Sequence, residues 1–174
     1  MRIPYHSAGD QVPSPALVAA WFKIEDLATE QVPLWAAHWI ADGKDGETLR
    51  ILAGLDGSDP HEVRDTLVAA LADTGTPIPS DLPEAITTVY RDLAQLHLAG
   101  KISAEQLIFK VARLVSSSDL ADEYFDQPLG AAYGFHYEWT CGCGHCSTPE
   151  ELQEPLREAC MAQISQHPNQ QPSG

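Results

Sequence analysis

Residues 32–75 read VPLWAAHWIADGKDGETLRILAGLDGSDPHEVRDTLVAALADTG, and their pattern decides the fold. Three short helical patterns are separated there by glycine and aspartate. Helices shorter than about 12–15 residues are marginal in water on their own, so we expect these helices to pack against one another. Their apolar anchors recur at three- or four-residue spacing: Trp35, Trp39, Leu49, Leu52, Val63, Leu67 and Leu71.

The stretch belongs to a predicted N-terminal helical half over residues 14–76, preceded by a flexible arm over residues 1–13. Ser14 is a suitable N-cap, Pro15 fits the first helical position, and the first helix should run to about Ala28. We expect Thr29 to cap the second helix, Asp45 the third and Asp59 the fourth. These helices should cover residues 30–42, 47–53 and 60–74.

A proline-rich connector, TPIPSDLP at residues 76–83, leads to a predicted C-terminal helical half over residues 80–167 that shares the core. One helix should follow a cap at Ser80 or Asp81, and others should follow Ser103 and Thr148. Residues 119–147 are less regular and end in a loop rich in glycine and cysteine, and residues 168–174 should be a disordered tail. No stretch alternates like a strand. The sequence therefore predicts an all-α bundle of about seven helices.

The charge of the chain points to the kind of partner it could bind. Ten basic and twenty-five acidic side chains give a formal charge of −15. A negative field repels phosphate backbones, so we expect no nucleic-acid binding. It attracts a basic protein and speeds the encounter. A simpler interpretation is that the charge keeps the protein soluble.

The location of the protein follows from what its sequence lacks. There is no run of about 18 or more apolar residues, so we expect no membrane span. The start, MRIPYHSAGDQVPSP, has one arginine and no apolar stretch, unlike a signal peptide. We therefore expect a cytoplasmic protein.

The motif CGCGHC at residues 141–146 is the most unusual local pattern. Thiolates this close together on a flexible backbone can wrap a tetrahedral metal, and four protein ligands make a structural zinc site. Reduced thiols in a loop, or a pair that switches to a disulfide, are the alternatives. The predicted ligands are Cys141, Cys143, Cys146 and Cys160, with His145 or His136 as the alternative.

Carboxylates surround two aromatic residues in the segment over residues 119–126. Aromatic side chains set among carboxylates suit docking onto a basic protein surface. A solvated acidic face over core aromatics is the alternative. The predicted partner-binding residues are Asp119, Asp122, Glu123, Tyr124, Phe125 and Asp126.

Two stretches carry a resemblance to known proteins. The segment from Leu34 to Gly75, together with LAGKISAEQLIFKVARL at residues 98–114 and the YEW around Trp139, is similar to small all-helical proteins of actinobacteria. The Gly-Lys-Ile-Ser-Ala-Glu turn that opens a helix at residues 100–105 also resembles the colicin D-type immunity proteins. The resemblance implies an all-α fold and, for the immunity family, inhibition of a toxin. The cysteine cluster departs from this pattern.

These observations favour a non-enzymatic interaction protein, an immunity-type inhibitor that covers a basic partner such as a toxin nuclease. No nucleophile elbow, phosphate loop, H-E-x-x-H motif or dinucleotide fingerprint occurs. A small zinc-binding or thiol-redox protein is one alternative. Another is a metal-dependent helical-bundle enzyme, which would need carboxylates to converge with His38 or His97 in the core.

Overall fold

The computed structural model describes residues 11–142 and 145–166. All regular structure in this part of the chain is helical: 71% of the described residues are helical, and they form nine α-helices and no strand. The prediction of an all-α fold is therefore confirmed. Residues 1–10 of the predicted arm and the predicted tail at residues 168–174 lie outside the described residues.

The chain divides into two compact units, Met1–Ala85 and Ile86–Gly174. The division falls a few residues after the predicted connector, inside the helix that follows it. That the two halves share one core stays a prediction.

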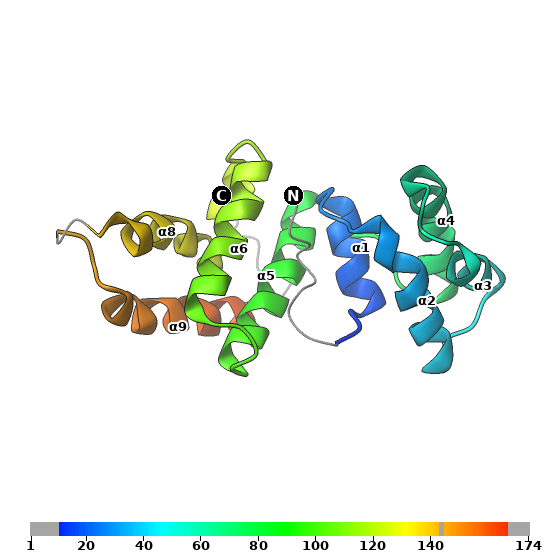
Figure 1. The fold of residues 1–174 in the computed structure, drawn as a ribbon, viewed down its shortest axis with the longest axis horizontal. Coiled ribbons are helices and arrows are strands. Elements are labelled where there is room, and N and C mark those ends of the chain that lie inside the picture. The colour runs from blue at the N-terminus through cyan, green and yellow to red at the C-terminus, as the bar shows by residue number, and fades with distance from the viewer. Residues whose placement is uncertain (1–10, 143–144, 167–174) are drawn as a thin grey trace. The chain divides into compact units, whose positions relative to one another are not determined.

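Unit 1 is built on the stretch that opened the sequence. Helix α3 packs against both α2 and α4, and α1 contacts α4 (Figure 1). All seven predicted anchors of residues 32–75 are buried, which confirms the helical packing expected from their spacing. The elements are α1 (Pro15–Lys23), the 3-10 helix η1 (Thr29–Gln31), α2 (Val32–Ala41), α3 (Glu47–Gly54) and α4 (Pro60–Asp73).

The end of α1 corrects the prediction that this helix runs to about Ala28. It stops at Lys23, because Glu25 adopts a left-handed backbone with φ of +61°. The amide of Asp26 then donates to the carbonyl of Trp21 across 3.0 Å, the closing bond of a Schellman turn. Glycine usually occupies the left-handed position, so a glutamate there leaves no sequence signal.

The start of α3 corrects a second prediction, that Asp45 caps it. Gly46 occupies the N-cap position and makes no side-chain cap. The cap comes from the end of α4 instead, where Asp73 Oδ2 accepts from the amide of Leu49 across 2.9 Å. A Cβ on Gly46 would overlap the Asp73 side chain, so the glycine lets α3 and α4 approach.

Pro13 ties the described end of the predicted arm to unit 1. It is buried, and its carbonyl accepts from Trp39 Nε1 across 2.8 Å. The Trp21 and Trp35 rings lie 5.8 Å apart beside each other in the same core. Three of the four tryptophans are therefore buried in unit 1.

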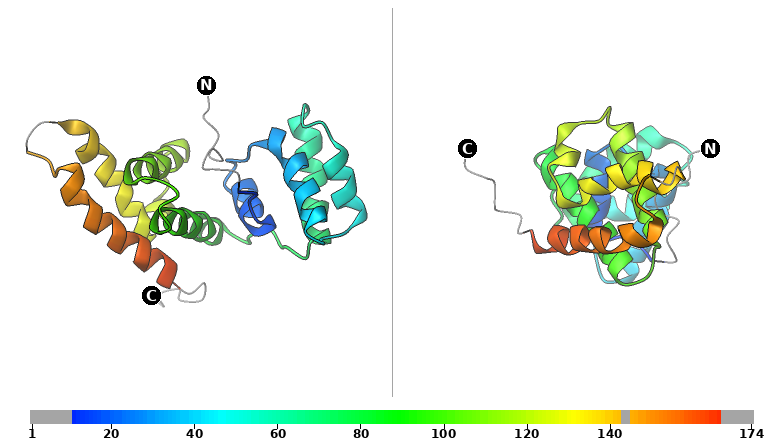
Figure 2. Two further views of the ribbon diagram at one scale, coloured as in Figure 1. Left: turned by 60° about the horizontal axis from the view of Figure 1, so that its bottom comes forward. Right: turned by 90° about the vertical axis from the view of Figure 1, so that its left-hand side faces the viewer.

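Unit 2 contains α6, with α8 packed against it and against α9 (Figure 2). The short η2 packs on α7 and α9. The predicted caps hold: Ser103 begins α6 and Thr148 begins α9, each in a reciprocal capping box. The elements are α5 (Leu82–Leu98), α6 (Ala104–Ser117), α7 (Asp122–Phe125), the 3-10 helix η2 (Pro128–Ala131), α8 (Ala132–Cys141) and α9 (Pro149–Ser165).

The irregular segment before the last helix is shorter than expected, because most of residues 122–141 is helical. The sequence pattern did not predict helix α8, and the reason is physical. Ala132 is its one fully buried residue, and aromatic side chains lie half-buried around it. A helix with no single apolar face gives no 3.6-residue period. Pro155 lies inside α9, which continues through it.

No described helix combines the length and apolar character that crossing a membrane requires.

Candidate functional site

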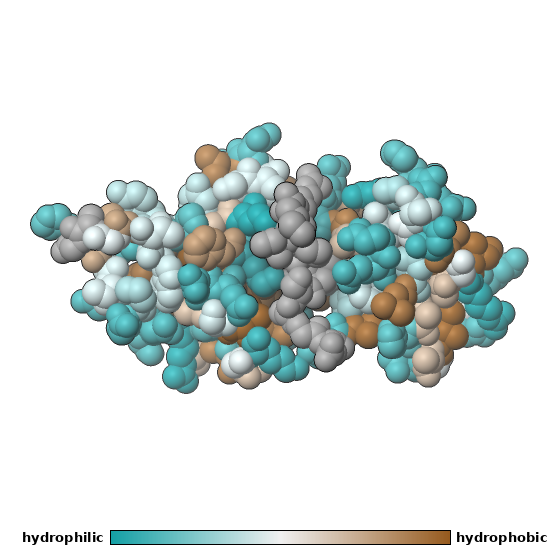
Figure 3. Space-filling view, in the orientation of Figure 1, coloured by the Kyte–Doolittle hydropathy of each residue, from teal (hydrophilic) through white to brown (hydrophobic). Residues whose placement is uncertain are grey.

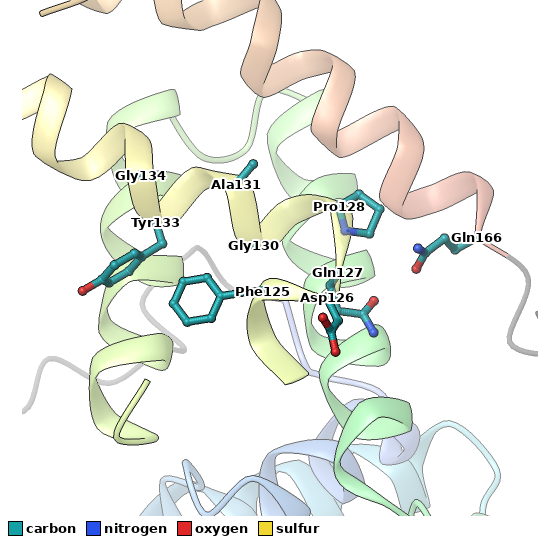
Figure 4. Close-up of a pocket in the computed structure, with 9 residues that line it drawn as sticks. All are labelled: Phe125, Asp126, Gln127, Pro128, Gly130, Ala131, Tyr133, Gly134 and Gln166. Carbon is teal, nitrogen blue, oxygen red and sulfur yellow. The ribbon is translucent and has the colours of Figure 1, made fainter. Parts of the chain in front are cut away.

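A pocket of about 590 Å³ lies in unit 2, where the end of α7, η2 and the start of α8 meet the end of α9. Figure 4 shows its lining: the Phe125 and Tyr133 rings lie side by side, and Gln166 lies across the view from them. The volume falls in the range of small-molecule and peptide side-chain sites. The lining residues are Phe125, Asp126, Gln127, Pro128, Gly130, Ala131, Tyr133, Gly134 and Gln166.

The chain enters the pocket through a tight turn after α6. Asp119 and Leu120 both have left-handed backbones, with φ of 55° and 59°. The amide of Leu120 donates to the carbonyl of Val115 across 3.1 Å, which closes the helix end. Left-handed conformations cost about 1–2 kcal/mol in a non-glycine residue, so surrounding structure holds this turn. The turn places α7 beside the pocket.

Gly130 brings η2 close to α7. A Cβ at this position would meet the carbonyl oxygen of Tyr124 and, at 2.9 Å, the Cα of Phe125. Only glycine therefore allows the two backbones to touch. This close approach sets Phe125 on one side of the pocket and Tyr133, three residues after Gly130, beside it.

The aromatic wall of the pocket is formed by Phe125 and Tyr133. Their ring centroids are 5.4 Å apart at an interplanar angle of 86°, the edge-to-face geometry that aromatic pairs prefer. Phe125 keeps 41% of its surface exposed. The wall therefore offers exposed aromatic surface to a ligand.

The buried side-chain amide of Gln163 holds η2 in place. Gln163 on α9 is fully buried; its Oε1 accepts from the amide of Leu129 across 3.1 Å and its Nε2 donates to Gln127 Oε1 across 3.0 Å. Thr87 on α5 donates to the same Gln127 oxygen across 3.2 Å. Buried polar groups that are satisfied in this way specify one arrangement. The pocket is thus pinned to α5 and α9.

The charge around the pocket has one dominant sign. Residues 114–156 contain no lysine or arginine, and they include every lining residue except Gln166. Asp126 at the pocket is exposed. A cation reaches the lining: the guanidinium of Arg91 donates to the carbonyl of Gln166.

The structure separates the predicted partner-binding residues into two groups. Phe125 and Asp126 line the pocket. Tyr124 is buried, and its ring centroid lies 6.1 Å from that of Tyr90, so its side chain is part of the core. The others lie on the surface outside the pocket lining, exposed or half-buried: Asp119, Asp122 and Glu123.

The cysteines occupy different surroundings. Cys160 is fully buried on α9, and burial raises the pKa of its thiol to about 11. Because zinc binds the thiolate, this surrounding disfavours Cys160 as a ligand. Cys141 and Cys146 are half-buried, and together they raise the pKa of the neighbouring Tyr137, Cys141 more strongly.

No group of three or more His, Cys, Asp or Glu side chains gathers around a possible metal position within residues 11–142 and 145–166. His145 is exposed, and Cys143 lies outside the described residues. His136 packs edge-to-face on Phe109 at 4.8 Å. The zinc site therefore stays a prediction.

The two histidines proposed for an enzyme core lie elsewhere. His38 is exposed on α2. His97 Nδ1 lies 3.2 Å from the carbonyl oxygen of Ile102, at the end of α5. Neither lines the pocket.

Apolar side chains also reach the surface of unit 1. Leu34, Ile51 and Val68 are each about half exposed, on α2, α3 and α4. Figure 3 shows apolar residues over this part of the molecule, interspersed with hydrophilic ones. Scattered apolar residues are ordinary on protein surfaces.

Sequence reasoning missed several residues that build the pocket, namely Gln127, Gly130, Tyr133, Gln163 and Gln166. Pro128 and Gly130 were the available local signals, since both favour a turn. In comparisons with known proteins, no protein-family model, curated protein or solved structure matches this chain.

Proposed function

We propose that this protein is a non-enzymatic binding protein that docks a basic protein partner at the pocket of unit 2. The observation that carries the proposal is the edge-to-face pair of exposed Phe125 and half-buried Tyr133, on a pocket that the exposed Asp126 also lines. Aromatic residues dominate the energetically important positions of protein interfaces. A pocket with an aromatic wall and an acidic edge suits a cationic side chain from a partner.

The charge distribution supports a basic partner. Eight carboxylates and no lysine or arginine occur over residues 114–156, in a chain of net charge −15. Such a field steers a basic protein to the surface and raises the association rate, an effect that salt screens. The carboxylates are Asp119, Asp122, Glu123, Asp126, Glu138, Glu150, Glu151 and Glu154.

The chemistry of the pocket favours binding over catalysis. Asp126 and Tyr133 are its titratable lining residues, and no histidine, cysteine or lysine borders it. General acid–base catalysis usually needs a second group poised near neutral pH. The lining is better suited to hold a ligand than to transform it.

The partner we propose is a toxin nuclease, inhibited by occlusion in the manner of an immunity protein. This step depends on the resemblance to colicin D-type immunity proteins at residues 100–105 and on the negative charge. A nuclease must present cations to its phosphate substrate, and an acidic protein can cover them. A cytoplasmic location would place the inhibitor where such a toxin acts.

The test compares capture of binding proteins from the native host. Wild-type protein, a Phe125→Ser/Tyr133→Ser double variant and an Asp122→Asn control are immobilised at equal density and exposed to lysate at low and high salt. We expect one basic protein to be retained by wild type and control, released by salt and lost from the double variant.

The double variant changes exposed or half-exposed side chains, and its folding is checked by circular dichroism. The proposal is wrong if no basic protein distinguishes wild type from the double variant at either salt concentration. Retention of the same proteins by all three forms would show adhesion to the general acidic surface.

A further inference from the structure

We propose that the pocket of unit 2 receives an arginine side chain from the partner, with the guanidinium against Phe125 and Tyr133 and paired with Asp126. This inference rests on the proposed function and specifies its recognition chemistry. It starts from three groups on one pocket: a partly exposed ring pair, a carboxylate and walls of small residues. Together they offer apolar ring surface on a pocket that also carries a negative charge.

A planar cation suits this lining better than a spherical one. Guanidinium is planar, weakly hydrated and able to stack on an aromatic ring while it forms two hydrogen bonds to one carboxylate. Ammonium is a compact and strongly hydrated charge. The walls at Gly130, Ala131 and Gly134 carry little or no side chain, so a flat group can reach the rings beside them.

The charged groups around the pocket set the orientation of the ligand. Asp126 is the carboxylate of the lining. Arg91 donates to the carbonyl of Gln166, across the view from the aromatic pair in Figure 4. Repulsion by Arg91 disfavours a second cation at the Gln166 end. The incoming guanidinium is therefore directed to the Phe125 and Tyr133 end.

The rest of the pocket can accept the chain that bears the arginine. Its volume of about 590 Å³ leaves room for backbone beside one side chain. The Gln163 and Gln127 hydrogen bonds hold η2 in place before a ligand arrives. A site fixed in advance loses less conformational freedom on binding.

The test uses three capped peptides that differ only at the central residue: acetyl-Gly-Arg-Gly-amide and its lysine and citrulline analogues. Each is titrated into the full ¹⁵N-labelled chain, and amide shifts are followed. The arginine peptide should shift the amides of Gln127, Gly130 and Gly134 saturably. The lysine peptide should bind several-fold more weakly, and the uncharged citrulline peptide should not saturate.

Variants separate the pocket from general charge. Asp126→Asn should lower the affinity for the arginine peptide by about tenfold, equivalent to about 1.4 kcal/mol of binding free energy. Asp122→Asn, the same change on the same segment outside the lining, should leave affinity within about twofold. Phe125→Leu should weaken binding about two- to fivefold, as loss of a partly exposed cation–π contact predicts.

Equal effects of Asp126→Asn and Asp122→Asn, or equal binding of arginine and lysine peptides, would overturn the arginine inference while a basic partner could still dock. If the lysate experiment fails as well, the proposed function fails with it. Shifts confined to residues outside the pocket would overturn the inference directly.

Discussion

Replacing Gly46 by alanine tests the contact between α3 and α4 that assembles unit 1. The backbone at Gly46 is extended, with φ of 166°, so any residue can adopt it. The effect of the substitution is therefore steric. An added Cβ would overlap the Cβ, Cγ and Oδ2 atoms of Asp73. Because the Asp73 Cβ cannot be moved by side-chain rotation, the two helices must shift apart.

The magnitude follows from three contributions. Displacing Asp73 removes its hydrogen bond to the amide of Leu49, a cap worth about 1 kcal/mol. Overpacking between the helices costs about 1–3 kcal/mol. Alanine restricts the unfolded chain and recovers about 0.4–1 kcal/mol. We expect Gly46→Ala to lower the free energy of unfolding by about 2 kcal/mol.

The assay is urea unfolding followed by tryptophan fluorescence in a Trp139→Phe background. The remaining tryptophans, Trp21, Trp35 and Trp39, are all buried in unit 1, so the signal reports that unit. The control is Gly54→Ala, at the end of α3, because an added Cβ there meets nothing within 4 Å. Gly54→Ala should raise the free energy of unfolding by about 0.5 kcal/mol.

A double variant separates the clash from the cap. Asp73→Ala alone should cost about 1 kcal/mol. In Gly46→Ala/Asp73→Ala the overlap with the carboxyl group is gone, so its cost should fall below the sum of the single effects. Additive effects, or Gly46→Ala as stable as Gly54→Ala, would refute the packing argument.

Three further predictions concern unit 2. Burial raises the pKa of Asp92 to about 6, opposed by the Lys110 charge. Asp92 thus binds its proton more tightly in the folded state than in the unfolded chain. Its contribution to the free energy of unfolding is therefore complete below about pH 4 and is lost as the pH rises through about 6. Asp92→Asn should be more stable than wild type above about pH 7 and equal near pH 4 in urea unfolding; a constant difference would contradict this. Tyr90→Phe should raise the free energy of unfolding by about 1 kcal/mol, since no described residue hydrogen-bonds the buried Tyr90 hydroxyl; a clear loss would reveal a partner for it. The zinc prediction is checked by metal analysis of protein purified without chelator. If the site is built on residues 141–146, wild type contains one zinc per chain, the Cys143→Ser variant contains none, and the Cys160→Ala variant still contains one. Absence of zinc from wild type would refute the prediction.

The features that sequence predicted correctly are local ones. Asp59, Ser103 and Thr148 cap their helices through bonds to amides at most three residues away, so the pattern contains both partners. The anchors of residues 32–75 follow a regular spacing on one face of each helix and are buried. Local bonds and amphipathic spacing therefore determined the all-α fold.

The features that sequence did not predict depend on contacts distant along the chain. Asp73 caps α3 across a separation of 24 residues. The pocket joins residues 125–134 to Gln166, and the buried Gln163 fixes it from another helix. No periodicity records such contacts. The aromatic and acidic character of residues 119–126 was visible, but the burial of Tyr124 beside the exposure of Phe125 required the fold.

The central claim is that the basic partner docks at the pocket of unit 2. Hydrogen–deuterium exchange on the full chain, with and without the protein captured from lysate, tests this most directly. The account predicts slower exchange over residues 122–134 and at the end of α9 near Gln166, and smaller protection with Asp126→Asn than with Asp122→Asn. Protection confined to residues 11–85 would contradict the claim.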